Sequence, residues 1–162
     1  MRSRARLIWI SVAFAIVIGA LAIAKDQRAF CTRVVDGDTI VVDIAGREEK
    51  VRLIGVDTPE TVDPRRPVEY FGKEASAFTK RLVRGKSVIL KDDPECHNRD
   101  RYNRLPRYVY LKDGTLVNAE IIKQGYGFAY VKYPFSLMEE FRKLEKAARK
   151  KGRGMWGSDQ QE

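Results

Sequence analysis

Short apolar runs, broken by glycine, proline and charged residues, fill much of the chain after residue 25 and predict β-strands. The runs with the length and β-branched content of a strand lie at residues 30–35, 39–44, 50–56, 87–91 and 107–111. Gly46 supplies the positive φ that a tight turn requires between the second and third runs. These two strands should therefore form a hairpin.

Apolar residues at spacings of three and four positions predict three helices in the rest of the chain. The first covers residues 69–83. Asn118 is placed to cap a second, short helix that Gly125 ends. Ser136 and Glu139 have the spacing of a capping box at the start of the last helix. Five short strands with three helices, without an internal repeat, make an α+β pattern.

The first 24 residues differ from the rest and predict an export signal. Three arginines precede an apolar run at residues 7–24, and Lys25 closes it. Small residues suited to signal cleavage occur near Ala22 and Ala24. The run also reaches the lower limit for crossing a bilayer, so a cleaved signal peptide and an uncleaved membrane anchor both remain open.

The arginines before this run would stay in the cytoplasm and the rest of the chain would lie outside. We expect a secreted or periplasmic protein, or one tethered to the outer face of the inner membrane through residues 7–24. The predicted parts are a signal or anchor at residues 1–24, a folded domain at 25–157 and a polar tail at 158–162.

Composition adds an anionic partner to this picture. Hydrophobic residues make up 44% and charged residues 33% of the chain, which suits a packed core and argues against disorder. The formal charge of +9 favours a polyanion such as nucleic acid, or anionic lipid. The alternative is that the lysines and arginines only keep the protein soluble.

Cysteine and histidine are scarce. Cys31 and Cys96 could pair as a disulfide in an oxidising compartment or remain free thiols, and both alternatives stay open. The absence of a CxxC motif or a Cys/His cluster argues against a zinc site. His97 is the one histidine and lies among loop residues, which excludes a mechanism based on a histidine pair.

The strongest chemical signal is a group of charged residues at the ends of two neighbouring predicted strands. Asp38, Asp57 and Glu60 supply carboxylates, and Arg52 lies between them in the sequence. Carboxylate oxygens are the ligands that Ca²⁺ prefers, and clustered acids need a cation or an arginine beside them. The alternative is that Asp38 and the preceding Asp36 only form a turn.

A second signal is basic and aromatic. Arg101, Tyr102 and Arg104 follow one another in a polar loop, a composition that suits phosphate binding and base stacking. Arg65 and Arg66 lie in a proline-rich loop and are further candidates for substrate binding. A solvated charged loop is the alternative in each case.

Taken together, these segments resemble the staphylococcal nuclease (thermonuclease) family over residues 31–156. The motifs that carry the resemblance, in chain order, are VVDGDT, VRLIGVDTPE, EYFGKEASAFTK, DRYNR, YVYLKDG, LVN, KQGYG and GMW. The resemblance implies an OB-fold, a five-stranded β-barrel packed by three helices, which agrees with the strand and helix pattern.

The resemblance also implies roles for single residues. Asp38 and Asp57 match the carboxylates that bind Ca²⁺ in the family, and Thr58 matches the position that lends a backbone carbonyl. Glu60 matches the proposed general base for the attacking water. The two phosphate-binding arginines of the family correspond to Arg52 and Arg104.

Some positions depart from the family pattern. Asn103 stands where glycine is frequent, and asparagine also tolerates a positive φ. Pro106 and Arg107 replace residues that are usually small or apolar, so we expect the strand after Arg104 to begin differently.

A further departure concerns the tyrosines that stack on nucleotides in the family. Tyr133 matches one of them. Val131 occupies the position of the other, and Tyr130 is placed to substitute for it.

The expected function is therefore that of a calcium-dependent endonuclease, acting as a monomer on DNA, RNA or both and leaving 3′-phosphorylated products. The alternative is a non-catalytic OB-fold module that binds nucleic acid at the cell envelope. That alternative would be favoured by the loss of an acid or arginine from the matching positions, and each of these positions keeps its residue type. A purely structural envelope protein would leave the acids and arginines unexplained.

Overall fold

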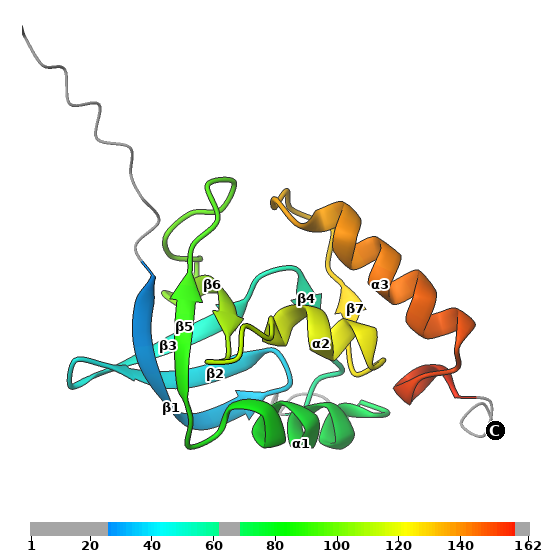
Figure 1. Ribbon diagram of the computed structural model, residues 1–162, viewed down its shortest axis with the longest axis horizontal. Helices are drawn as coiled ribbons and strands as arrows, with labels where there is room; N and C mark the ends of the chain where they lie inside the picture. Colours follow the sequence, from blue (N-terminus) through cyan, green and yellow to red (C-terminus); the bar gives the residue numbers. More distant parts are fainter. Residues whose placement is uncertain (1–25, 62–68, 158–162) are drawn as a thin grey trace, which may run out of the picture.

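In a computed structural model of the protein, which describes residues 26–61 and 69–157, five strands close into a barrel in the order β1-β2-β3-β6-β5 (Figure 1). The strands are β1 Gln27–Asp36, β2 Thr39–Ile44, β3 Arg47–Leu53, β5 Ser87–Lys91 and β6 Leu105–Tyr110. β3 pairs with β6 in parallel, and the other neighbours are antiparallel. With three α-helices in the described part of the chain, this arrangement confirms the α+β, OB-like prediction. The predicted N-terminal signal or anchor lies outside the described residues.

The hairpin between β2 and β3 follows from its two turn residues. Ala45 and Gly46 have φ angles of 51° and 84°, the pair of positive values that matches the twist of a two-residue hairpin. Because Ile44 pairs directly with Arg47, β3 begins three residues earlier than the predicted strand at residues 50–56. That predicted strand also ends earlier, because the chain turns at Gly55, where φ is 69°.

After Gly55 the chain continues as β4, Val56–Asp57, which pairs with β7, Phe128–Ala129, in a separate two-stranded sheet. A side chain at Gly55 would meet the ring of Phe135 at 2.5 Å, so the close approach requires glycine as well as the φ angle does. This small sheet carries Asp57, one of the predicted site residues, away from the barrel wall.

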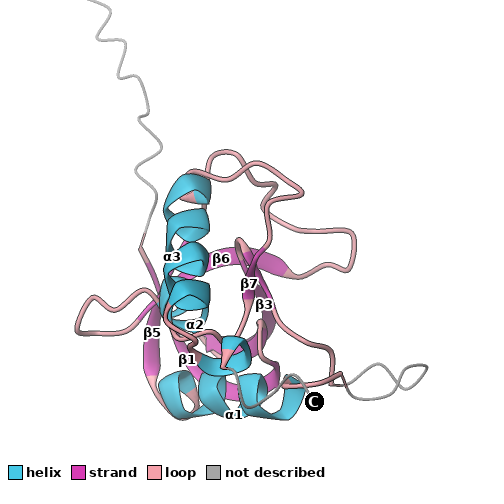
Figure 2. Ribbon diagram, turned by 90° about the vertical axis from the view of Figure 1, so that its right-hand side faces the viewer, coloured by secondary structure: helices cyan, strands magenta, loops and turns pink. Residues whose placement is uncertain are grey.

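Helix α1, Gly72–Val83, packs against β1, and its buried face includes Ala75 and Thr79. It begins three residues after the predicted start, because Phe71 has a φ of 65°. Helix α2, Val117–Lys123, lies against both α1 and α3, Met138–Lys150. In Figure 2, α1 runs across the bottom of the view while α3 runs up it. A short 3₁₀ turn, Gly154–Trp156, follows α3. Within residues 26–61 and 69–157, the helices are too short or too polar to cross a membrane.

Two predicted helix caps are wrong, and the first is Asn118. Leu116 occupies the N-cap position of α2, and Asn118 lies fully buried in its first turn. Its side chain accepts a hydrogen bond from the Val109 amide at 2.9 Å and donates to the carbonyl oxygens of Ile54 and Arg107 at 2.9 and 3.2 Å. The side chain thus satisfies strand backbone groups in the core, which solvent cannot reach.

The second wrong cap is the box predicted from Ser136 and Glu139. Leu137 occupies the N-cap position of α3, and the Ser136 hydroxyl donates instead to Asp93 at 3.0 Å. Asp93 is 2% exposed and also accepts hydrogen bonds from the Ser136 amide and the Tyr108 hydroxyl, at 2.8 and 2.6 Å. The buried carboxylate therefore joins β6 to the chain entering α3.

Asp93→Asn should lower the free energy of unfolding at pH 7 by about 2–3 kcal/mol, because an amide would turn a donor toward groups that themselves donate. Burial raises the pKa of Asp93, but hydrogen bonds from Tyr108, Ser136 and the Glu95 amide outweigh burial and lower it. The ionised Asp93 carboxylate therefore stabilises the folded state fully above about pH 4, and this contribution disappears as the pH falls through the folded-state pKa of Asp93.

Urea unfolding of the wild type and of Asp93→Asn between pH 2 and 7 measures this effect. Asp92→Asn, a change at the exposed neighbouring position, is the matched control and should leave the midpoint unchanged. A constant difference between Asp93→Asn and the wild type across this range would contradict the role given to the carboxylate.

The predicted strand at residues 107–111 begins at Leu105, two residues earlier. Pro106 lies opposite Arg52 in the parallel β3–β6 pair and is tolerated there because it is near the start of the strand. Arg104 is therefore the last residue before the strand.

Candidate active site

Arg52, near the end of β3, contacts both aspartates that the sequence analysis grouped with it. Its Nη2 lies 3.2 Å from Asp38 Oδ2 and 3.2 Å from Asp57 Oδ1. Its Nη1 donates to the carbonyl oxygen of Val56 at 2.6 Å, which ties the guanidinium to the backbone of β4. One arginine therefore brings the two carboxylates to a common point.

Asp38 is held by hydrogen-bond donors on both carboxylate oxygens and is 7% exposed. Oδ1 accepts from the Thr39 hydroxyl at 2.9 Å. Oδ2 accepts from the amide and the hydroxyl of Thr58 at 3.1 and 3.2 Å. A side chain at Gly37 would meet Thr58 at 2.7 Å, so the glycine of the DGDT motif allows this approach.

Asp57 extends from β4 with its side chain half exposed, at 50%. Burial raises the pKa of Asp57, Arg52 opposes that rise, and the carboxylates of Asp38, Glu69 and Glu60 add to it. The site thus holds more negative charge than one guanidinium balances. Such a site favours the binding of a cation.

Glu60 lies beside these aspartates. Its Oε1 accepts a hydrogen bond from the Thr61 amide at 3.0 Å, and its own amide donates to Glu69 Oε2 at 3.1 Å. Asp36, interpreted from the sequence only as a turn residue, lies close enough to Glu60 for the two side chains to interact, and it accepts a hydrogen bond from the Thr61 hydroxyl at 2.7 Å. Burial raises the pKa of Asp36 to about 6, and the neighbouring Asp38 contributes to that rise.

Arg104 reaches the site from the loop before β6. Asp100 Oδ2 accepts hydrogen bonds from its Nε at 2.8 Å, and Asp100 Oδ1 accepts from its amide at 2.9 Å. Its Nη1 lies 3.5 Å from the Thr39 hydroxyl, which itself donates to Asp38. Asn103 has a φ of 60°, as predicted, and this conformation lets the chain turn so that Arg104 folds back onto Asp100.

Two positioning residues, Asp100 and Thr39, were absent from the sequence-based site. An acid four residues before Arg104 was the available signal for Asp100, and the threonine of DGDT was the signal for Thr39. Neither spacing is specific enough to identify a contact, because it depends on how the loop folds back toward β2.

The predicted substrate-binding residues lie in two described places. Tyr102 is 62% exposed, with the guanidinium of Arg101 4.7 Å and that of Arg104 5.1 Å from its ring centroid. Tyr130 and Tyr133 follow β7 with their ring centroids 6.1 Å apart, and the Tyr130 amide donates to the Gly55 carbonyl at 2.9 Å. In the antiparallel pairing of β7 with β4, Phe128 lies opposite Asp57, and the tyrosines follow on the side of Gly55. Arg65 and Arg66 lie outside the described residues.

The cysteines do not form a disulfide in the structure. Cys31 is fully buried in β1, where burial raises the pKa of its thiol to about 11, and Cys96 lies in the loop after β5. Their sulfurs face different partners, the carbonyl oxygens of Arg33 and Pro134. Of the two alternatives left open by the sequence, the structure has free thiols. His97 is exposed, as expected for a loop residue.

Within the part of the chain that the structure describes, no group of three or more His, Cys, Asp or Glu side chains is arranged to share a metal ion. The cluster instead offers two carboxylates, Asp38 and Asp57, with the Thr58 backbone beside them. Hard cations such as Ca²⁺ accept carboxylate and carbonyl oxygens and complete their shell with water or substrate. The donor set therefore fits a hard cation and not zinc.

Comparison with known proteins gives consistent results. The sequence model described as staphylococcal nuclease homologue matches residues 50–158, a range that includes Arg52, Asp57, Glu60 and Arg104. The thermonuclease of Staphylococcus hyicus is 40% identical over 139 residues, which cover 85% of this chain and 80% of that protein. The thermonuclease of Staphylococcus intermedius is 44% identical over 136 residues, with 82% and 77% covered. The SPbeta prophage-derived endonuclease YokF of Bacillus subtilis is 37% identical over 129 residues, covering 78% of this chain and 43% of that protein.

Proposed function

This chain belongs to the staphylococcal nuclease family and is a nuclease of the hydrolase class, and we propose that it is a calcium-dependent endonuclease that leaves 3′-phosphorylated products. The observation that carries the proposal is the contact of Arg52 with both Asp38 and Asp57. It joins the carboxylates that suit a hard cation to an arginine that suits a phosphate. DNA, RNA or both are the substrates.

The calcium ion would be held by the carboxylates of Asp38 and Asp57 and by the backbone carbonyl of Thr58. Two features support this assignment. Asp57 is half exposed and retains room for a ligand, and its raised pKa reflects surplus negative charge from the neighbouring acids as well as burial. When bound, the ion supplies Lewis-acid stabilisation of the negative charge that grows on the phosphate oxygens.

Glu60 is the proposed general base, which takes a proton from the water that attacks phosphorus. A carboxylate suits this role when it is positioned close to the scissile phosphate, and general-base help contributes about 10²–10⁴ in rate. The Thr61 amide donates to Oε1 of Glu60, and the Asp36 side chain lies beside the same carboxyl group, so Glu60 is restrained near the aspartate cluster.

Arg52 and Arg104 are proposed to bind the phosphate oxygens. Planar guanidinium groups match the geometry of phosphate, and fixed donors stabilise the transition state more than the ground state. Asp100 restrains Arg104 through Nε, which leaves Nη1 directed toward Thr39 and the aspartate cluster. Both arginines are therefore anchored before the substrate arrives.

Exposed aromatic and basic side chains at two edges of this site suit the bases and phosphates next to the scissile bond. Tyr102 with Arg101 provides one surface and Tyr130 with Tyr133 the other, since aromatic rings stack on bases of any sequence. The 3′-phosphorylated product follows the reaction of the family, in which the bond on the 5′ side of the phosphate is cleaved.

We also propose export, as a secreted, periplasmic or membrane-tethered monomer, on the strength of the charge and hydrophobicity of residues 1–24.

Removal of divalent metal ions should abolish cleavage. The purified chain is expected to degrade plasmid DNA and RNA in Ca²⁺, to stop in excess chelator, and to resume when Ca²⁺ is restored, because the carboxylate cluster then regains its cation. Parallel reactions in Mg²⁺, Mn²⁺ and Zn²⁺ test the identity of the metal, and Ca²⁺ should give the highest rate.

The ends of the products test the direction of cleavage. Fragments of a labelled oligonucleotide should become substrates for polymerase extension only after phosphatase treatment, as 3′-phosphates require. If the chain cleaves neither DNA nor RNA in all four metal ions, the enzymatic proposal is overturned. If the fragments can be extended by polymerase without phosphatase treatment, the proposed 3′-phosphorylated products are overturned.

A further inference from the structure

One open end of the barrel is lined by charged side chains on its inner face. Along β3, alternate residues point inward, so Arg47 and Glu49 continue the row of the buried Val51 and Leu53. Arg107 occupies the corresponding inward row of β6 and is 8% exposed. Charged residues are ordinary at the exposed and partly exposed positions of Arg47 and Glu49, but core formation alone would favour an apolar residue at the buried position of Arg107.

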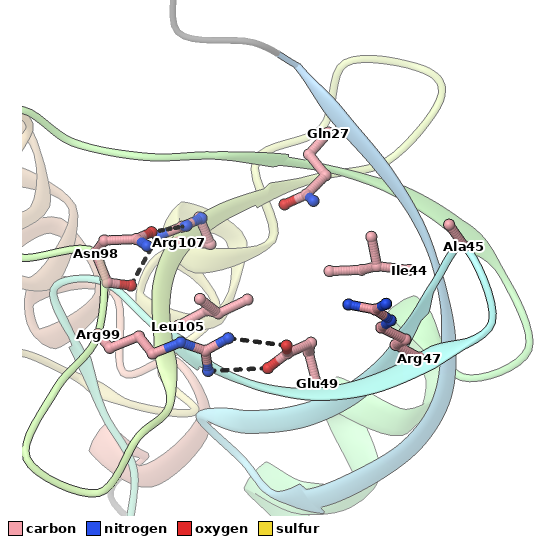
Figure 3. A pocket seen from close by; sticks show the side chains of 9 residues that line it. All are labelled: Gln27, Ile44, Ala45, Arg47, Glu49, Asn98, Arg99, Leu105 and Arg107. Atoms are coloured by element: carbon pink, nitrogen blue, oxygen red, sulfur yellow. Dashed lines mark hydrogen bonds and ion pairs between the residues drawn. The ribbon is translucent and has the colours of Figure 1, made fainter.

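These side chains line an open pocket of about 580 Å³, which is within the size range of small-molecule sites. Figure 3 shows Gln27 from β1, Ile44 from β2, Arg47 and Glu49 from β3 and Arg107 from β6 arranged around the space between the strands. The loop before β6 adds another basic side chain, described next. Side chains from four strands thus surround one cavity, as in small barrels that hold one ligand.

The pocket carries a surplus of positive charge. Arg99 from the loop pairs with Glu49 through both nitrogens, at 2.8 and 2.9 Å, while Arg47 and Arg107 also line the cavity. Arg107 donates through Nη1 to the backbone carbonyl oxygens of Asn98 and Pro106 and through Nη2 to the side-chain oxygen of Asn98. Among the described residues it forms no ion pair with a carboxylate. Three guanidinium groups therefore share one carboxylate.

Burial lowers the pKa of Arg107, and the nearby positive charge of Arg99 lowers it further, whereas Asp92 opposes them. Arg99 and Arg107 thus repel each other across the pocket, and an anionic ligand would relieve that repulsion. A second cavity of about 580 Å³ shares Arg107, but there two aspartates, Asp26 and Asp92, balance the two arginines Arg28 and Arg107. The anionic preference is specific to the pocket around Arg47.

The walls of this pocket are already positioned. Arg99 is fixed by Glu49 and by the carbonyl oxygen of Asn103, to which its Nη1 donates at 2.9 Å. Arg47, by contrast, has no hydrogen bond or ion pair with any residue for which the structure gives a position, so its guanidinium remains available. Ile44 and Leu105 supply apolar surface beside these charges. Guanidinium groups next to an apolar surface suit a ligand in which a phosphate group is joined to a flat organic ring.

We propose that this pocket is a second nucleotide-binding site, separate from the catalytic cluster, in which Arg47, Arg99 and Arg107 bind the phosphate group. Arg52 lies on the outer face of β3, between the inward-facing Val51 and Leu53, so the two sites use opposite faces of the strand. Along β3, Arg47 and Arg52 are about 16 Å apart. The preference for nucleotides over other phosphate esters rests on the proposed nuclease function, but the phosphate site itself does not.

The test is an NMR titration of the full chain in excess chelator, which prevents turnover. The probes are a 3′-phosphorylated mononucleotide, inorganic phosphate and a short single-stranded oligonucleotide without terminal phosphates. The mononucleotide should shift the backbone amides of Arg47 and Arg99 in a saturable way and bind more tightly than inorganic phosphate. The Arg52 amide reports separately on the catalytic site.

Arg47→Met should weaken binding measured at the pocket amides about tenfold, through loss of one charged hydrogen-bonding group. This variant should fold normally because Arg47 is exposed and unpaired among the described side chains. Arg84→Met, at an exposed position outside the pocket lining, is the matched charge control and should bind like the wild type.

Each outcome bears on the proposal. A response to the mononucleotide alone assigns the pocket to cleavage products, and an equal response to the oligonucleotide assigns it to the substrate strand. Equal affinity for inorganic phosphate and mononucleotide would overturn the nucleotide preference. Pocket amides that stay unshifted, or an affinity unchanged in Arg47→Met, would overturn the site itself. Because binding is read without cleavage, these results stand apart from the nuclease assay.

Discussion

Glu60→Gln is expected to lower the turnover number by about 10²–10⁴, the contribution typical of a positioned general base. Glutamine keeps the size of the side chain and the oxygen that accepts from the Thr61 amide, but it cannot accept a proton from water. KM should change little, since the phosphate contacts proposed for Arg52 and Arg104 are untouched. Steady-state cleavage of a defined oligonucleotide in saturating Ca²⁺ measures both constants.

The pH dependence separates this role from a structural one. The wild-type rate should rise with pH as the base ionises, and Glu60→Gln should lose the contribution of Glu60 to this limb, because the amide does not titrate. The contribution of Asp57, whose pKa is raised, should persist in the variant. Glu48→Gln, an exposed position on β3, is the matched control for loss of one carboxylate. Turnover within a few-fold of the wild type, with the pH limb unchanged, would remove Glu60 from the base role.

Arg52→Lys is expected to reduce kcat/KM by about 10²–10³, the loss seen when a preorganised charged or polar donor is removed from a transition-state site. Arg52 contacts Asp38, Asp57 and the Val56 carbonyl at the same time. Lysine keeps the positive charge but presents a point charge in place of a planar fork, so it cannot hold these partners and a phosphate together.

Arg33→Lys, at an exposed position on β1, is the control for replacing an arginine by a lysine, and it should leave kcat/KM unchanged. Urea unfolding of Arg52→Lys should give a midpoint near that of the wild type in Ca²⁺, because the charge beside the two aspartates is retained. A large loss of stability with normal activity in the folded fraction would assign Arg52 to structure instead of catalysis. Comparison in Ca²⁺ and in chelator shows whether the arginine and the metal ion compensate the same carboxylates.

The two variants probe one arrangement from different sides. Asp57 has a raised pKa because burial and three neighbouring carboxylates, Asp38, Glu69 and Glu60, act on it together, and among the described residues Arg52 opposes them. A change at Arg52 therefore alters the charge interactions of the neighbouring carboxylates, and a change at Glu60 alters the electrostatic field at Asp57. Their combined effect should be smaller than the product of the single effects, as is usual for groups that act on the same step.

Local pattern was sufficient for much of the barrel. The strands at residues 39–44 and 87–91 were predicted with the bounds that the structure has, and the turn at Gly46 was predicted from its φ preference. Alternation of side chains has a period of two residues, so even short runs indicate which face is buried. Asp38, Arg52 and Asp57 could be grouped because they stand at the ends of strands adjacent in the chain.

The wrong helix caps show where local pattern fails. Asn118 and Ser136 each had a favourable capping position in the sequence, yet both bind partners from distant segments. A buried backbone group or carboxylate that needs a hydrogen bond outweighs a cap that water could replace. The sequence offers no way to weigh these two demands, because burial is known only after the chain folds.

The sequence by itself determined the fold class, the family and the residue types of the catalytic cluster, since each depends on spacing within short segments. Tertiary structure alone decided that Asp100 holds Arg104, that Asp36 meets Glu60, and that Arg47 shares a pocket with Arg107. These contacts join segments far apart in the chain or depend on loop conformation. They arise from strand register and barrel closure, which set the distances between segments that are separate in the sequence. The pattern of residues within one short segment does not determine these distances.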